Sequence, residues 1–403
     1  MHLPYQGAPQ KRCFWFKTRC TEDGVVGERL DIDPSGARCG CFLPDLTRLA
    51  RHLPAPTSQG SYTKAFMLMQ GLRFLASSRV ACNRHGMKHA EQITFGGSSL
   101  DRAAELRPNI EPILADPTAR TIVLWRGKLL LTKDGGPLER LPLDHPITKD
   151  AGALRVFLGR DDDGPVFALS LDAWDPELPD ANEIGGFVDL TLQQHPATGD
   201  AVFMELRAIM TTLSARDAEL AATAKAVISW NRSHRFCSAC GHESQSEDAG
   251  WKRLCPSCNT PHFPRTDPVV IMLIVSGDNV LVGRSQGWPE GMYSLLAGFV
   301  EPGETMQAAV RREVVEETNV RVGPVSFLAS QPWAFPSSLM LGCYGEAETT
   351  EITVDPTELD DAKWVSREEM QRAFDGDHPT MTAARKGAVA RFLLENWLTN
   401  TLD

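Results

Sequence analysis

The sequence has no long apolar run, which excludes a large class of proteins. A membrane-spanning helix needs about 18 or more consecutive apolar residues. The best candidate, Phe66 to Ala76, is short and is interrupted by Gln70 and Arg73. It also lies far from the N-terminus, where a signal peptide would begin. We therefore expect no membrane span, and we expect the protein to be cytoplasmic.

The sequence also has fewer basic than acidic residues. The chain has 41 Lys and Arg against 52 Asp and Glu, a formal net charge of -11. Residues 1–86 hold 12 basic against 6 acidic residues, so residues 87–403 hold 29 against 46. The excess of acidic residues in 87–403 argues against a broad nucleic-acid-binding surface. It is compatible with a metal site built from carboxylates.

The cysteine pattern of a secreted disulfide framework is missing as well. Four of the ten cysteines are tightly organised, and the other six show no comparable spacing: Cys13, Cys20, Cys39, Cys41, Cys82 and Cys343. With no secretion signal, we interpret the cysteines as reduced thiols plus one metal site.

A chain of 403 residues is too long for one ordinary core, so we expect a multidomain protein. Residues 1–86 mix Gly, Pro, Arg and Cys without sustained periodicity. Our hypothesis is that they form a poorly ordered basic extension, translated because an upstream start was assigned. A basic targeting arm is the alternative. We expect a domain to begin at Met87.

Residues 87–232 have the pattern of an α+β domain. Short apolar runs between turns predict strands, and two stretches predict helices. Ser214 and Asp217 are placed as an N-cap pair for the second helix. We find no catalytic motif here, which leaves a scaffold, dimerisation or substrate-gating role. The expected strands lie within 121–132, 155–171 and 187–192, and the expected helices within 204–213 and 217–234.

Residues 264–403 return to an alternating pattern of strands and helices. Apolar, β-branched runs predict strands at 268–275, 280–284 and 294–300, with a turn at 277–279. A helix is expected from Thr305 to Glu317, and an amphipathic helix from Gly387 to Leu398 closes the chain.

Four cysteines between these domains form two CxxC pairs. Cys237 and Cys240 are followed, after 14 intervening residues, by Cys255 and Cys258. Four thiolates satisfy tetrahedral Zn²⁺ and leave no open position. The spacing therefore predicts a structural zinc ribbon over 233–263. A redox CxxC and paired disulfides are the alternatives, and neither has the expected context.

The segment RREVVEET, from Arg311 to Thr318, places like charges together on one helix. At 100° per residue, Glu313, Glu316 and Glu317 fall within an arc of about 100°. Like charges four residues apart cost a few tenths of a kcal/mol. Hard divalent cations that bind oxygen ligands and bridge to phosphates would compensate this repulsion. We expect the three carboxylates to face water, with Ala309 keeping their face open and Val310 and Val314 packing on a sheet.

Residues 298–320 carry the spacing of a known motif. The segment GFVEPGETMQAAVRREVVEETNV resembles the Nudix hydrolase box, GX5EX7REUXEEXGU, over its whole length. One position departs: Asn319 replaces the second Gly, at a helix end where Asn is the next most tolerant residue. The resemblance implies a C-terminal Nudix α/β/α sandwich. It gives Gly298, Glu304 and Arg312 structural roles, with Arg312 paired to Glu304.

A second segment indicates which branch of the family the chain resembles. SQPWAFPSSLM, Ser330 to Met340, resembles the SQPWPFPxS array of the NADH pyrophosphatase branch, and the zinc ribbon belongs to that branch too. The resemblance makes Glu358 an additional metal ligand and Ala390 a residue at the nucleotide base. The alternative is a Pro-rich strand end that packs on the core. The expected substrate-binding residues are Phe263, Ala297, Phe299, Gln331, Pro332, Trp333, Ala334, Phe335, Pro336, Ser337, Ser338 and Ala390.

The resemblance implies hydrolysis of NADH or NAD⁺ at the diphosphate, giving nicotinamide mononucleotide and AMP. It also implies removal of NAD caps from RNA and a homodimer. The expected cofactors are Mg²⁺ or Mn²⁺ and a structural Zn²⁺. Two alternatives remain: a Nudix hydrolase for another substrate such as ADP-ribose, and a non-catalytic zinc-ribbon binding module. The expected catalytic and Mg²⁺ or Mn²⁺ ligands are Glu313, Glu316, Glu317 and Glu358, and the zinc ligands are Cys237, Cys240, Cys255 and Cys258.

Overall fold

The computed structural model describes residues 14–21, 24–31, 87, 89–176 and 189–402. The chain divides into two compact units, Met1–Val80 and Ala81–Asp403. In the first unit, β1 (Phe14–Thr21) pairs antiparallel with β2 (Gly24–Asp31). The rest of the predicted basic extension lies outside the described residues.

The C-terminal domain is built on a six-stranded mixed sheet. Its strands are β12 (Asp267–Ser276), β13 (Asn279–Ser285), β14 (Leu296–Phe299), β15 (Val322–Trp333), β16 (Ser338–Ala347) and β17 (Leu359–Ser366). They lie in the order β15-β16-β12-β13-β17, and β14 pairs with β12. β12 and β16 run parallel, as expected for strands joined by a long crossover.

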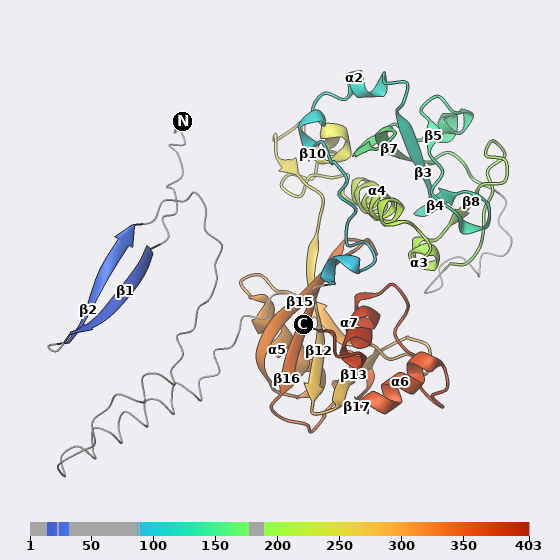
Figure 1. Ribbon diagram of the computed structural model, residues 1–403. Coiled ribbons are helices and arrows are strands. Elements are labelled where there is room, and N and C mark those ends of the chain that lie inside the picture. The colour runs from blue at the N-terminus through green and yellow to red at the C-terminus, as the bar shows by residue number, and fades with distance from the viewer. Residues whose placement is uncertain (1–13, 22–23, 32–86, 88, 177–188, 403) are drawn as a thin grey trace, which may run out of the picture. The chain divides into compact units, whose positions relative to one another are not determined.

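Helices cover both faces of this sheet (Figure 1). They are α5 (Met306–Thr318), α6 (Arg367–Asp375) and α7 (Val389–Leu398). Successive residues of β12 point to opposite faces. Val270, Met272 and Ile274 therefore pack in the cluster with α5, whereas Ile271 and Leu273 pack in the cluster with α7. The predicted α/β/α sandwich is confirmed.

The N-terminal domain has a second six-stranded sheet. Its strands are β3 (Arg120–Trp125), β4 (Lys128–Leu131), β5 (Leu141–Pro142), β6 (Val156–Asp161), β7 (Gly164–Ser170) and β8 (Val202–Met204). α4 (Ala215–Ser233) packs on this sheet, and α2 (Glu111–Leu114) and α3 (Leu206–Ile209) are single turns. Ser214 caps α4 by accepting from the Asp217 amide, as predicted.

The two sheets share one topology. The N-terminal order is β6-β7-β3-β4-β8 with β5 on β3, which repeats the C-terminal order strand for strand. The central pair β3 and β7 is parallel, like β12 and β16. Between β14 and β15 stands the carboxylate helix α5, whereas between β5 and β6 stands only a five-residue 3-10 helix, η5 (Pro146–Asp150). The N-terminal domain thus repeats the fold without the helix that carries the carboxylates.

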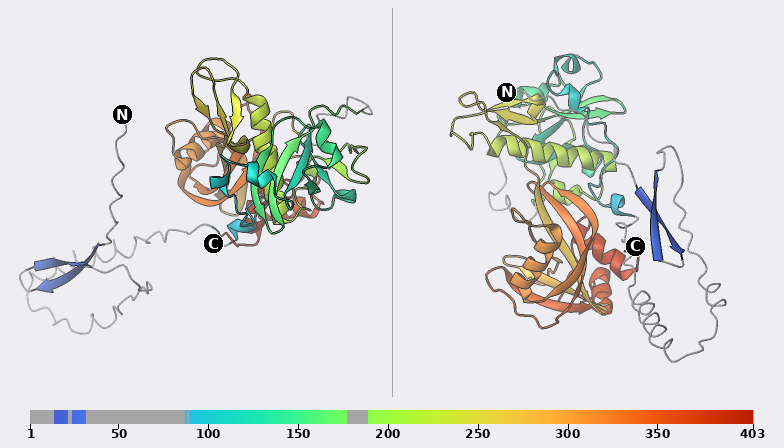
Figure 2. Two further views of the ribbon diagram at one scale, coloured as in Figure 1. Left: turned by 90° about the horizontal axis from the view of Figure 1, so that it is seen from above. Right: turned by 90° about the vertical axis from the view of Figure 1, so that its left-hand side faces the viewer.

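A small three-stranded sheet lies between the two domains in sequence. It consists of β9 (Gln245–Glu247), β10 (Lys252–Leu254) and β11 (Pro261–His262), with β10 in the centre. Asn231 of α4 donates to the Gly250 carbonyl at 2.8 Å, and Trp251 Nε1 donates to the Phe157 carbonyl at 2.7 Å. These bonds attach the small sheet to the N-terminal domain (Figure 2).

Two expectations of local structure are wrong. Residues 189–192 of the expected strand 187–192 have no regular structure, and 187–188 lie outside the described residues. The helix expected over 204–213 is reduced to α3, and its first residue, Met204, instead ends a strand that pairs with β4.

Candidate active site and metal centres

The helix α5 carries the carboxylates and is fixed at both ends. Thr305 caps its N-terminus by accepting from the Ala308 amide at 3.2 Å. Asn319 ends it in the left-handed conformation, with φ 59° and its amide bonded to the Val315 carbonyl. Asn thus adopts the left-handed conformation expected of it where the Nudix pattern has Gly. The loop-helix-loop of the motif survives this substitution.

Three carboxylates converge from two elements. Glu313 and Glu317 lie one turn apart on α5, and Glu358 comes from the turn before β17. One oxygen from each lies within 4.8 Å of the others. Glu313 and Glu317 are buried, at 8% and 6% exposure, and only Glu358 is exposed. The expectation that the α5 carboxylates face water is therefore wrong for two of the three.

Burial gives this cluster an unusual charge state. It raises the pKa of Glu317 to about 8, with further contributions from the neighbouring charges of Glu313 and Glu358. Burial also raises the pKa of Glu313. Glu317 Oε2 is buried with no hydrogen-bond partner among the described residues. A buried oxygen without a donor and a group of mutually repelling carboxylates both fit a divalent cation with oxygen ligands.

Glu316 stands beside this cluster. Its side chain is 52% exposed, and its Oε2 accepts from Arg312 Nη1 at 2.9 Å. Ala309, which was expected to keep the carboxylate face open, is fully buried with Val310 and Val314 against the sheet. That expectation is wrong because the carboxylate face itself turns towards the domain interior.

Arg312 braces the loop before α5. Its Nε and Nη2 donate to the two oxygens of Glu304 at 2.8 and 2.9 Å, and Nη2 also donates to the Phe299 carbonyl. Its Nη1 reaches Glu313 Oε1 at 2.9 Å. The Arg312 bonds lower the pKa of Glu304 to about 2, helped by the Glu301 amide. The pairing that the family resemblance implied is present.

Gly298 makes room for a carboxylate. A Cβ atom at this position would lie 1.9 Å from Cδ of Glu313 and about as close to both of its oxygens. Gly298 lies on β14, directly paired with Val270 of β12. The first glycine of the motif is therefore required by space, because any side chain there would displace Glu313.

A cavity of about 300 Å³ opens beside Glu317. Predicted substrate-binding residues on its wall are Ala297, Gln331, Trp333 and Ala390. Two arginines line it as well, Arg207 from α3 of the N-terminal domain and Arg385 from the loop before α7. Sequence reasoning missed both, and no local pattern marks either one. The arginines supply positive charge opposite the acidic cluster, as a diphosphate substrate requires.

Gln331 does not offer its amide to a ligand. It is fully buried, and its Nε2 donates to the carbonyls of Thr94 and Gly387 at 2.8 Å each. Its Oε1 accepts from the Val389 amide at 2.8 Å. The prediction that Gln331 supplies a polar substrate contact finds no support, because these backbone bonds occupy its amide. Gln331 instead ties β15 to the start of α7 and to the segment before β3.

The predicted aromatic wall is split among cavities. Trp333 and Phe335 meet edge to face with centroids 4.9 Å apart, but Phe335 lies in a separate groove beneath Arg207 and Lys225. Ala334 is buried against the N-terminal core. Ser337 donates to Asp267 at 2.9 Å. The remaining predicted residues of this segment line the neighbouring cavities: Pro332, Pro336, Ser337 and Ser338.

Phe263 and Phe299 are 63% and 60% exposed. Neither lines the cavity beside Glu317. Large exposed aromatic side chains are suited to stacking on a flat ligand, so their predicted role stays a prediction.

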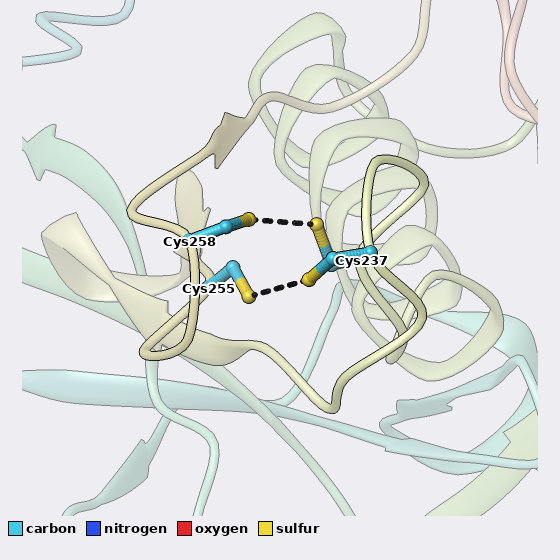
Figure 3. A group of neighbouring side chains, drawn as sticks. Cys237, Cys255 and Cys258 are labelled. Carbon is cyan, nitrogen blue, oxygen red and sulfur yellow. Dashed lines mark hydrogen bonds between the residues drawn. The ribbon is translucent and has the colours of Figure 1, made fainter.

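The four predicted zinc ligands converge (Figure 3). Cys237 Sγ lies 3.6 Å from Cys258 Sγ, and Cys240 Sγ lies 3.5 Å from Cys255 Sγ. All four sulfurs lie within 4.8 Å of one another. Tetrahedral Zn²⁺ with Zn–S bonds of about 2.3 Å needs sulfurs roughly 3.8 Å apart, so the group fits the ion. Thr260 bonds to Cys258 Sγ and lowers the pKa of that thiol to about 6, which favours the thiolate.

Three family models match the chain in succession. Residues 118–230 match an NADH pyrophosphatase-like rudimentary NUDIX domain, and residues 232–263 match an NADH pyrophosphatase zinc ribbon domain. Residues 265–385 match a NUDIX domain. The rudimentary match agrees with a domain that has the topology without the carboxylate helix.

Several curated proteins are similar to the chain. The NAD-capped RNA hydrolase of Schizosaccharomyces pombe is 32% identical over 357 residues, covering 75% of this chain and 93% of that protein. The NAD-capped RNA hydrolase NudC of Stutzerimonas stutzeri is 34% identical over 265 residues, 66% of this chain and 82% of that protein. The human NAD-capped RNA hydrolase NUDT12 is 43% identical over 197 residues, but the match spans only 43% of its length and 46% of this chain.

Among the described residues, no helix is long and apolar enough to cross a membrane.

Proposed function

The chain belongs to the Nudix hydrolase family, in the branch with an NADH pyrophosphatase zinc ribbon, and from this premise we propose a reaction for it. It hydrolyses the diphosphate bond of NADH or NAD⁺ to AMP and reduced or oxidised nicotinamide mononucleotide respectively, and it removes NAD caps from RNA 5′ ends. The observation that carries the proposal is the buried cluster of Glu313, Glu317 and Glu358 beside a cavity lined by two arginines.

Glu313, Glu317 and Glu358 are the residues that would hold Mg²⁺ or Mn²⁺. Bound there, the cations would screen the diphosphate charge and lower the pKa of the attacking water. Glu316 completes the acidic set at the exposed side of the cluster, and its bond to Arg312 fixes its position. Arg207 and Arg385 bring positive charge to the wall of the same cavity, where the substrate's phosphates need it. Trp333 supplies a flat apolar surface for a ring of the substrate.

Three further assignments belong to the same proposal. The Cys₄ group holds a structural Zn²⁺ and takes no part in the chemistry, because four thiolates leave no open position. The protein works as a homodimer, as the family resemblance implies. It acts in the cytoplasm. Sedimentation of the purified protein and imaging of the tagged full chain test the last two directly.

Product analysis tests the reaction itself. Purified protein with Mg²⁺ or Mn²⁺ is given NADH, NAD⁺, ADP-ribose and NAD-capped RNA in parallel, with Glu317→Gln as the inactive control. We expect reduced nicotinamide mononucleotide and AMP from NADH, and nicotinamide mononucleotide with a 5′-monophosphate RNA from the capped RNA. Turnover of ADP-ribose alone would keep the carboxylate site and overturn the substrate. No turnover at all would favour a zinc-ribbon binding module.

A further inference from the structure

We infer that a line of basic side chains, leading from the active-site cavity over α4 towards the zinc ribbon, binds the RNA chain that follows an NAD cap. This inference rests on the proposed function, because it concerns the part of a capped substrate that lies outside the catalytic cavity. The adenosine of such a cap is the first nucleotide of the RNA, so a phosphodiester chain must leave the cavity. We call this line the basic track: Arg126, Arg207, Lys225, Arg232 and Arg235.

Shared wall residues connect three cavities into one path. Arg207 lines both the active-site cavity and a groove beside Phe335. Arg126 and Arg232 line that groove and also a larger cavity bounded by the zinc ribbon. The groove and the larger cavity measure about 720 and 990 Å³. The three cavities therefore adjoin one another, with Arg207 between the first two and Arg126 and Arg232 between the groove and the larger cavity.

The charge of the groove is opposite to that of the chain around it. Residues 87–403 carry 46 acidic against 29 basic residues. The groove wall nevertheless has four cationic side chains, Arg126, Arg207, Lys225 and Arg232, and one carboxylate, Glu205. Such a local reversal in an acidic protein marks a surface for a polyanion, and the phosphate backbone of RNA is one.

The helix α4 presents part of the track as one stripe. Lys225, Ser229 and Arg232 are spaced by four and three residues, so they share one face of the helix, and all three line the groove. Lys225 is held in place by the Gly127 carbonyl at 2.9 Å. Arg126 is 48% exposed and pairs with Asp175, which is 81% exposed. An ion pair that exposed is worth little, so a phosphate can replace the carboxylate.

Aromatic side chains accompany the cations. Phe335 lies in the groove, with the Arg207 guanidinium 4.4 Å from its ring centroid. Trp174 lines the larger cavity and packs on the buried ring of Trp125, with the ring centroids 5.0 Å apart. A cationic groove with aromatic surfaces is the arrangement that binds single-stranded nucleic acid, where phosphates meet the cations and bases stack. An acidic peptide would need the cations but would have no use for the rings.

Direct binding tests the track without catalysis. The full chain, with its zinc retained and without added Mg²⁺ or Mn²⁺, is titrated into a labelled, 5′-monophosphorylated single-stranded RNA of about 20 nucleotides, longer than the sites of common single-strand binders. Arg232→Glu is compared with Arg372→Glu, because both are the basic residue in the last turn of a helix. We expect Arg232→Glu to raise Kd about tenfold or more and Arg372→Glu to change it less than about twofold. Equal effects of the two variants would overturn the inference.

The salt dependence and the decapping rate complete the test. For Arg126→Glu combined with Arg232→Glu, the slope of log K against log salt concentration should fall by about 0.7 for each phosphate that the protein no longer neutralises. The ratio of kcat/KM for capped RNA to kcat/KM for NAD⁺ should fall with it, and an unchanged ratio would contradict the track. Arg232→Gln, which removes the charge without reversing it, replaces Arg232→Glu if that variant does not fold. If NAD⁺ and capped RNA are both inert, the proposed reaction fails, while the binding comparison still decides the track.

Discussion

A Cβ atom on Gly298 would lie 1.9 Å from Cδ of Glu313, so the backbone of β14 leaves space that only a glycine can leave for that carboxylate. The Glu313 carboxylate can therefore occupy its position only because residue 298 is a glycine. Gly298 therefore leaves the room in which the buried carboxylate of Glu313 lies.

Gly298→Ala should abolish the metal site while leaving the fold. The added methyl group overlaps the Glu313 carboxylate, and overpacking of this kind costs about 1–3 kcal/mol of stability. We expect hydrolysis of NADH to fall by more than about a hundredfold, beyond the cost of losing a supporting residue of a metal site. Gly323→Ala is the matched control, because its nearest contact is an ordinary 3.4 Å to Glu348. Full activity of Gly298→Ala would disprove the steric argument.

In the absence of Mg²⁺ and Mn²⁺, the protein should lose stability as the pH rises from about 4.5 to 8. The folded pKa of Glu317 is raised to about 8 from an ordinary value of 4.5, so the folded state keeps a proton that the unfolded state releases in this window. Each pH unit within it costs up to about 1.4 kcal/mol. Denaturant unfolding in buffer without Mg²⁺ or Mn²⁺, with the zinc of the ribbon retained, measures this slope. Glu317→Gln should flatten it, and Mn²⁺ should reverse it by binding the ionised form; a slope unaffected by the substitution would exclude Glu317 as its source.

Removing one zinc ligand should unfold the ribbon and release the metal. Cys240→Ser leaves three thiolates, and metal binding supplies much of the folding energy of so small a unit. We expect the zinc content to fall from one per chain towards zero, with loss of amide protection over 237–258. Cys343→Ser is the control, because Cys343 is buried in the C-terminal core away from the cluster. Retention of one zinc per chain by Cys240→Ser would contradict the four-thiolate site.

Gln331→Leu should lower the stability of the fold rather than weaken substrate binding directly. The change leaves the carbonyls of Thr94 and Gly387 and the amide of Val389 without their partner. Each buried group left unpaired costs about 1–3 kcal/mol. Chemical unfolding should show that loss, whereas an unchanged unfolding midpoint with a raised KM for NADH would mean that Gln331 contacts the substrate after all.

What the sequence could predict was local. The helix α5, the left-handed Asn319 and the pair of Arg312 with Glu304 all lie within 23 residues, where helix geometry and motif spacing determine the contacts. The four thiol ligands follow from spacing in the same way. Two CxxC pairs leave little freedom in where their sulfurs can meet.

What it could not predict depends on residues far apart in the chain. Gln331 bonds to Thr94 across 237 positions, and no local pattern shows that its amide is already occupied. Arg207 reaches the cavity from a domain with no motif of its own. Ala309 was placed on an open face by helix periodicity alone, but periodicity does not show which side of a helix the sheet covers. The repeated topology of the N-terminal domain was hidden for a similar reason, since strand order is a property of pairing.

The rate of AMP release from NADH under single-turnover conditions tests the central claim most directly. Glu317→Gln is compared with the wild-type protein in Mn²⁺, and with Glu368→Gln, an exposed position of α6, as the matched control. The buried carboxylate cluster predicts a fall of more than about a hundredfold for Glu317→Gln and a wild-type rate for Glu368→Gln. Release of AMP by Glu317→Gln at the wild-type rate would contradict the assignment of the active site.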